Sequence, residues 1–162
     1  MFKYIYDDDN GIPVFEEYFE YLQSIKEVIG DELFNFAIDI NRYNLTSKHS
    51  LHDSWLKSVQ INDSIGSSRG TGFTETDILI QLLGPHHDRL FHLIYKDVKK
   101  YNLNKPEKNI PANNYDLLCH EVRLNEKQEK EHLVQFDNEI IFQVTFSEFK
   151  FEEHIITNLG SE

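Results

Sequence analysis

Cysteine is nearly absent from the sequence. The chain contains one cysteine, Cys119, so no disulfide can form within it. Scarce cysteine fits a reducing compartment, and we expect a cytoplasmic protein. The N-terminal segment MFKYIYDDDNG lacks the continuous apolar stretch and the small-residue cleavage site of a secretory signal. No apolar run approaches the roughly 20 residues that a membrane helix needs, so we expect no association with a membrane.

Basic side chains are also scarce. The sequence has 16 Lys and Arg against 28 Asp and Glu, which gives a formal net charge of −12. A field of this sign repels phosphate backbones and argues against nucleic acid as a partner. It favours cationic partners, among them basic protein surfaces and metal ions. Acidity also keeps a protein in solution without serving any partner, so the charge alone does not select a function.

Apolar and aromatic side chains are plentiful. Hydrophobic residues make up 40% of the chain, with 12 Phe and 8 Tyr, which is typical of a globular protein with a substantial core. The length of 162 residues suits one domain. We expect a single domain over residues 1–162, with a helical part at about 13–45 and a β-rich part at about 52–156.

An amphipathic pattern begins near the N-terminus. Apolar residues recur at three- and four-residue steps between Pro13 and Gly30, which predicts a helix with Pro13 near its first turn and Gly30 at its end. Asp31 can cap a second helix, whose apolar face we extend to Ile40. Two short helices joined at Gly30 predict a helical hairpin whose apolar faces cover a sheet or each other.

After about residue 50 the apolar period changes from 3.6 to 2, as in β-strands. Strands are predicted at SWLKSVQIN, DILIQLL, LFHLIYK and EIIFQVTF. Turns at Gly84–Asp88 and at Asp137-Asn138 indicate antiparallel hairpins. The phase of the apolar residues flips between Phe146 and Phe149, where we expect a bulge or a corner.

Two segments, 62–74 and 102–114, are rich in Gly, Ser, Asn and Pro and are predicted to be loops. Residues 66–72 resemble a phosphate-binding loop in composition only, because no lysine and no clear helix follow the glycines. Helices that precede most of the strands predict an α+β fold, with an N-terminal helical hairpin packed on a mainly antiparallel β-sheet.

Histidine is the residue type that most suggests chemistry. Eight histidines are present, and the groups at 49–53, 86–88 and 120–121 place imidazoles beside a carboxylate. They define an alternative hypothesis, a metal-dependent hydrolase that draws on a set of candidate ligands: His52, Asp53, His86, His87, Asp88, His120 and Glu121. Because neighbours on a strand point to opposite faces, at most alternate members of each group can converge. Each histidine can equally be a polar residue in a turn.

The N-terminal segment combines aromatic and acidic side chains. Aromatic residues alternate up to Tyr6, as in an edge strand, and three aspartates follow. Tyrosines anchor interfaces and charge steers the approach of a partner. We therefore predict a binding surface for a basic protein, formed by Tyr6, Asp7, Asp8 and Asp9 together with Arg69. The alternative is a first strand packed on the sheet, followed by a solvated acidic turn.

The pattern after residue 51 resembles a known class of proteins. Leu51-His52-Asp53-Ser54 leads into an alternating strand, two more strands follow, and a short strand near His120-Glu121 precedes the hairpin HLVQFDNEIIFQVTF. Over about residues 51–151 this order resembles small bacterial domains that include immunity proteins of toxin systems. The resemblance implies a protein that binds and blocks a partner without chemistry of its own.

Three functions therefore follow from the sequence. The leading hypothesis is a non-enzymatic cytosolic protein-binding domain, an immunity-like inhibitor of a basic partner, which needs no cofactor. The second is the metal-dependent hydrolase, and the third is a structural or oligomeric component, for which a large exposed apolar patch would argue. The oligomeric state stays open.

Overall fold

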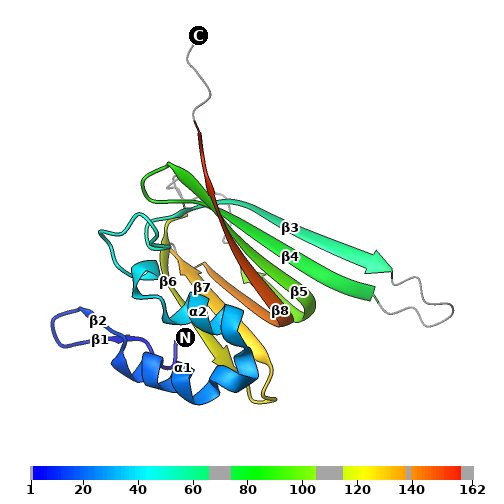
Figure 1. The fold of residues 1–162 in the computed structure, drawn as a ribbon, viewed down its shortest axis with the longest axis horizontal. Helices are drawn as coiled ribbons and strands as arrows, with labels where there is room; N and C mark the ends of the chain where they lie inside the picture. Colours follow the sequence, from blue (N-terminus) through cyan, green and yellow to red (C-terminus); the bar gives the residue numbers. More distant parts are fainter. Residues whose placement is uncertain (1, 66–73, 105–114, 138–139, 158–162) are drawn as a thin grey trace, which may run out of the picture.

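The computed structural model describes residues 2–65, 74–104, 115–137 and 140–157, and consists of a helical layer on a β-sheet (Figure 1). The helices are α1 (Glu16–Ile29), α2 (Asp31–Ile38) and a short 3-10 helix, Ile40–Arg42. The sheet contains six strands: β3 (Trp55–Ile65), β4 (Thr74–Leu83), β5 (Arg89–Asn104), β6 (Leu117–Leu124), β7 (Lys130–Phe136) and β8 (Ile141–Ile155). Strands β1 (Tyr6–Asp7) and β2 (Pro13–Val14) form a separate hairpin.

The six-stranded sheet is antiparallel throughout, in the order β3-β4-β5-β8-β7-β6. The helical hairpin covers its β6–β7–β8 side (Figure 1). The predicted α+β fold, a helical hairpin on an antiparallel sheet, is therefore confirmed. Neither helix of the described chain has the length and apolar character that a membrane crossing requires.

Helix α1 forms because its apolar residues lie on one face. Tyr18, Leu22, Ile25 and Ile29 are buried, at steps of four, three and four residues. The helix begins at Glu16, so the prediction of Pro13 in its first turn is wrong. Pro13 instead pairs with β1, because the Asp8 amide hydrogen-bonds the Ile12 carbonyl and closes the hairpin.

Helix α2 ends earlier than predicted. The Asp39 carboxylate accepts a hydrogen bond of 3.0 Å from the Asn41 amide and so starts a separate 3-10 turn. Ile40 belongs to that turn and is 49% exposed, so its assignment to the apolar face of the second helix is wrong.

Two strands extend into segments predicted to be loops. Residues 62–65 belong to β3 and residues 102–104 to β5, where each pairs with a neighbouring strand. Polar composition did not reveal these pairs, because backbone ladders tolerate any side chain on a solvated face. The rest of both loop predictions, including the glycines of 66–72, lies outside the described residues or in β4.

A register shift lies beside the segment where a bulge or corner was expected, but not within it. The pairing of β5 with β8 is regular from Phe149 to Phe146 and shifts between Val98 and Lys100, opposite Phe146 and Thr145. Asp97, beside this shift, has a φ of +48°. The extra residue is a β-bulge on the partner strand β5.

The core joins α2 to the middle of the sheet. The ring of Phe36 lies 4.9 Å from that of Phe149 and 5.0 Å from that of Phe151, between centroids, and Phe151 contacts Phe91 at 5.8 Å. These residues mark the face of β5 and β8 that meets the helices. Because side chains alternate along a strand, His92 and its neighbours at alternate positions lie on the opposite face.

The edge strand β6 is covered by the N-terminal part of the chain. The hydroxyl of Tyr18 accepts a hydrogen bond of 2.8 Å from the Val122 amide, and the hydroxyl of Tyr21 accepts one of 2.9 Å from the Leu124 amide. Two donors that would otherwise be free at a sheet edge are thus satisfied by helix α1.

Candidate functional site

The β1–β2 hairpin presents the acidic residues singled out in the sequence. The carboxylate of Asp8 accepts hydrogen bonds from the amides of Ile12 (2.9 Å) and Asn10 (2.8 Å), which hold the pKa of Asp8 below its usual value. Asp8 therefore shapes the turn. Asp7 and Asp9 are exposed and keep their carboxylates available to a partner.

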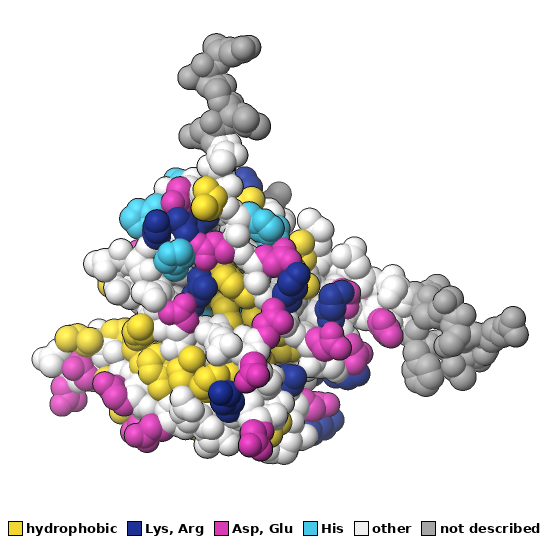
Figure 2. Space-filling view, in the orientation of Figure 1, with side chains coloured by type: hydrophobic (Ala, Val, Ile, Leu, Met, Phe, Trp, Pro, Cys, Tyr) yellow, Lys and Arg dark blue, Asp and Glu magenta, His cyan; other side chains and the backbone are white. Residues whose placement is uncertain are grey.

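A hollow of about 660 Å³ lies behind this hairpin. Four large hydrophobic side chains that line it are also exposed to solvent: Tyr6 (46%), Ile12 (59%), Leu45 (65%) and Leu118 (39%). They come from the hairpin, the 43–54 connection and β6. Figure 2 shows hydrophobic side chains gathered beside the hairpin, with acidic side chains along its outer margin. We call these four residues, with Asp7 and Asp9, the hairpin surface.

His120 also lines the hollow and is 1% exposed. Its ring stacks on Tyr43 at 4.6 Å, and its Nδ1 lies 3.1 Å from Nε2 of His132. The Nδ1 of His132 in turn lies 2.8 Å from the Tyr95 hydroxyl. Burial lowers the pKa of His120 well below its usual value, and burial lowers the pKa of His132 to about 3. Both rings are therefore neutral at pH 7.

The hydrogen bonds that link Tyr95, His132 and His120 determine which ring nitrogens carry a proton. The buried Tyr95 hydroxyl bonds no other group of the described residues, so it donates to His132. His132 then carries its proton on Nε2 and donates to His120. His120 is left with an Nε2–H that has no partner among the described residues. This nitrogen is closed off from solvent, although other atoms of the ring line the hollow.

The candidate metal ligands of the sequence occupy different places. His52 and His120 both line the hollow, and His52 forms an ion pair of 3.0 Å with the exposed Asp53. His87 instead lies in the β4–β5 turn against Trp55, at 4.1 Å between ring centroids. His86 is exposed in the same turn, where Asp88 pairs with Arg89 at 2.8 Å.

Glu121 has a structural role. It is fully buried, and its carboxylate accepts hydrogen bonds from the amides of Lys3 (3.0 Å), Tyr4 (2.8 Å) and Ile5 (3.2 Å). These bonds hold the N-terminal segment, which is why only Tyr6–Asp7 of the predicted first strand pairs as a strand. A carboxylate committed to three amides is a poor candidate for a metal ligand.

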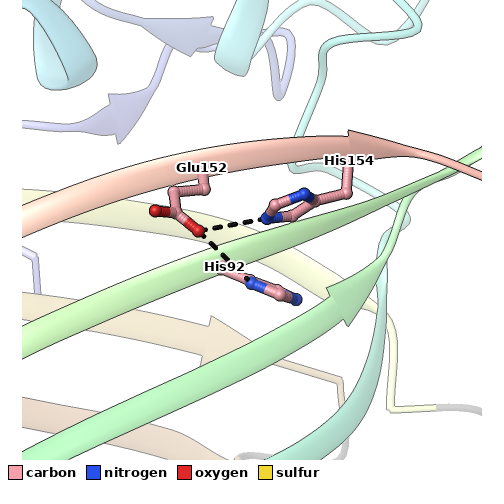
Figure 3. A group of neighbouring side chains, drawn as sticks. All are labelled: His92, Glu152 and His154. Carbon is pink, nitrogen blue, oxygen red and sulfur yellow. Dashed lines mark hydrogen bonds and ion pairs between the residues drawn. The ribbon is translucent and has the colours of Figure 1, made fainter.

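One group in the described part of the chain does bring three potential metal ligands together: His92, Glu152 and His154 (Figure 3). Glu152 and His154 rise from β8 and His92 from β5, and the register places His92 opposite Glu152. Burial lowers the pKa of His92, and hydrogen bonds from Lys150 and His154 lower that of Glu152.

This group was not predicted from the sequence, because its three ligands do not form a cluster of adjacent residues. The signal present was Glu152 and His154 at positions i and i+2 of a strand, which share a face. The contribution of His92 depends on strand pairing and could not be found without it.

Arg69 and Cys119 were also considered in the sequence. Arg69 lies outside the described residues. Cys119 lies on β6, where burial raises the pKa of its thiol to about 12, so it is a neutral thiol and a poor nucleophile.

No family model, no curated protein and no solved structure matches this chain in the comparisons made.

Proposed function

We propose that the chain is a non-enzymatic, cytosolic protein-binding domain that captures a basic partner through the hairpin surface. One observation carries this proposal. Exposed large hydrophobic side chains from three separate segments line the same hollow, directly beside free carboxylates. Apolar anchors in a hollow with a charged rim are the arrangement by which protein interfaces combine affinity with steering.

The hollow fits an apolar side chain of the partner. Ile12, Leu45, Leu118 and the aromatic ring of Tyr6 are among the residues that line it, together with polar residues such as Arg42 and His52.

The rim favours positive charge around that anchor. Asp7 lines the hollow, Asp9 is exposed in the turn of the same hairpin, and Glu16 and Glu17 are exposed at the start of helix α1. With a net charge of −12, the protein attracts a basic surface from a distance and accelerates the encounter at low salt. An immunity-like inhibitor that blocks a basic cleft matches this chemistry.

Peptides of defined composition test the proposal. One fluorescent peptide places a leucine between arginines, and its matched control replaces the leucine with serine. We expect saturable binding of the first and at least about tenfold weaker binding of the second, because the anchor is lost. Equal binding of both peptides would contradict the proposal, since it would reveal only diffuse charge attraction.

Matched variants locate the surface. The double substitution Asp7→Asn with Asp9→Asn should weaken binding about tenfold, whereas Glu27→Gln with Glu126→Gln, which removes the same charge elsewhere, should change it less than about twofold. Ile12→Ser tests the anchor against Val28→Ser on α1, which is exposed to a similar degree (59% and 53%). A dimer that Ile12→Ser abolishes would instead assign the surface to a second copy of the chain.

A further inference from the structure

We propose that His92, Glu152 and His154 bind a divalent transition-metal ion of the zinc class, on the sheet face opposite the helices. This site goes beyond the proposed protein binding and shares no residue with the hairpin surface. Two imidazoles and one carboxylate are a ligand set that zinc accepts, with further coordination positions left for water.

The distances suit a common ion. One ligand atom from each of the three residues lies within 4.8 Å of the other two. The Glu152 Oε2 is 3.1 Å from the His154 Nε2 and 3.8 Å from the His92 Nδ1. Two ligands on one tetrahedral zinc ion lie about 3.3 Å apart, given bonds of about 2.0–2.1 Å. Small rotations of the side chains therefore bring all three to bonding distance.

The backbone fixes this convergence. Glu152 and His154 occupy alternate positions of β8 and so share one face, and His92 is the cross-strand partner of Glu152 on β5. At His92, strand β5 is paired on both sides, with β4 and with β8, whereas Glu152 and His154 of β8 pair with β5 alone, because β7 reaches only to Phe146. A site on rigid paired strands needs little ordering when an ion binds. Figure 3 shows the two rings and the carboxylate turned toward one another.

An outer partner orients the His92 ring. The side-chain amide of Gln81, on β4, lies 2.8 Å from the His92 Nε2. In this structure the nitrogen of that amide faces the ring and donates to Nε2. When a metal binds Nδ1, Nε2 carries a proton, so the Gln81 amide turns over and its carbonyl oxygen accepts that proton; the two ends of an amide are distinguished only by such bonding. A hydrogen-bond partner on the second ring nitrogen is the usual support of a metal-binding histidine.

The surroundings leave room for the ion. Lys150 contacts Oε1 of Glu152 at 2.6 Å, while both histidines approach Oε2. The Lys150 side chain is 58% exposed, so its ammonium group can move away into solvent. The side chain of His154 is 52% exposed, so an ion can enter from solvent and keep water as a further ligand.

Zinc titration tests the site directly. Untagged protein is dialysed against a chelator, and ZnCl₂ is added while heat is recorded calorimetrically. We expect one saturable site per chain, and substitution of Co²⁺ should give the visible absorption of a tetrahedral ion. The absence of saturable Zn²⁺ binding would overturn the proposal.

Variants distinguish this site from scattered surface histidines. His154→Ala and Glu152→Gln should each lower zinc affinity more than about 100-fold, and Gln81→Leu about 10-fold, as for loss of an outer partner. His86→Ala removes an exposed histidine from the β4–β5 turn and should leave the affinity unchanged. Equal losses in His86→Ala and His154→Ala would refute the assigned site. Because His154 and Glu152 are surface residues, circular dichroism should show both variants folded.

Discussion

Two histidine pairs in this protein have similar spacing and opposite surroundings. The rings of His120 and His132 lie 5.2 Å apart between centroids, and those of His92 and His154 lie 4.5 Å apart. The first pair is buried among aromatic rings, and no carboxylate of the described residues is bonded to it. The second lies on the outer face beside Glu152. The comparison shows that burial and the nearest charge decide what a histidine pair can do.

The buried pair has a structural role, and it lowers the stability of the folded protein in acid. Protonation of either ring would place a charge in an apolar core, so the folded protein resists it until far below pH 6. The surface pair can share a cation, because the Glu152 carboxylate lies 3.1 Å from the His154 ring and 3.8 Å from the His92 ring and solvent is near.

The pH dependence of stability should reveal the buried pair. Its folded-state pKa values lie below the unfolded value of about 6.5, so the unfolded chain binds more protons as pH falls. Stability is complete above pH 6.5 and declines below it by up to about 1.4 kcal/mol per pH unit for each histidine. Between pH 6.5 and 5 the pair should lower the free energy of unfolding by up to about 4 kcal/mol. Urea unfolding at several pH values measures this loss.

A non-titrating variant sharpens that measurement. His132→Gln keeps a polar side chain of similar reach but cannot gain a proton. As pH falls, the free energy of unfolding of this variant should therefore decline at about half the rate seen in the parent protein. An unchanged slope would show that other groups cause the acid loss. Measurements above pH 5 separate the effect of the histidines from that of carboxylates. Asp88, for example, has a pKa lowered to about 2.

Truncation should separate the two pairs at neutral pH. His132→Ala removes a fully buried ring, leaves Tyr95 and His120 without hydrogen-bond partners, and should cost about 3 kcal/mol of unfolding free energy. His154→Ala, on an exposed side chain, should change stability by less than about 0.5 kcal/mol. Equal costs in metal-free protein would contradict the division into a structural and a surface pair.

Zinc should stabilise the protein only through the surface pair. At a free zinc concentration of 100 times the dissociation constant, binding to the folded state adds about 2.7 kcal/mol of stability, which raises the melting temperature. His154→Ala should lose this increase, whereas a His120→Gln variant should keep it. Zinc stabilisation that depends on His120 would place the ion in the core and contradict the assignment of metal binding to the surface pair.

Much of the fold followed from local pattern. The spacing of Tyr18, Leu22, Ile25 and Ile29 defined the buried face of α1, and alternation defined the cores of β4, β5 and β8. Ends of elements were less predictable. Pro13 joined a hairpin and Ile40 a 3-10 turn because hydrogen bonds of Asp8 and Asp39, absent from any periodicity, set those boundaries.

The candidate sites divide in the same way. The acidic turn beside Tyr6 was visible in the sequence, although only the structure distinguished the turn-forming Asp8 from the available Asp7 and Asp9. The hollow was not predictable, since Leu45 and Leu118 reach it from distant segments. Glu121 is next to a histidine in sequence, yet it serves the backbone of the N-terminal segment.

The sequence by itself determined the charge, the apolar faces and the order of helices and strands, because these depend on residue type and on contacts a few positions apart. Only the tertiary structure decided which histidines meet. His92 faces Glu152 because of the register between two strands some 60 positions apart in sequence, and no local pattern encodes that register. The same folding buries His120 against His132 and leaves His154 in reach of an ion, which gives one residue type two different roles.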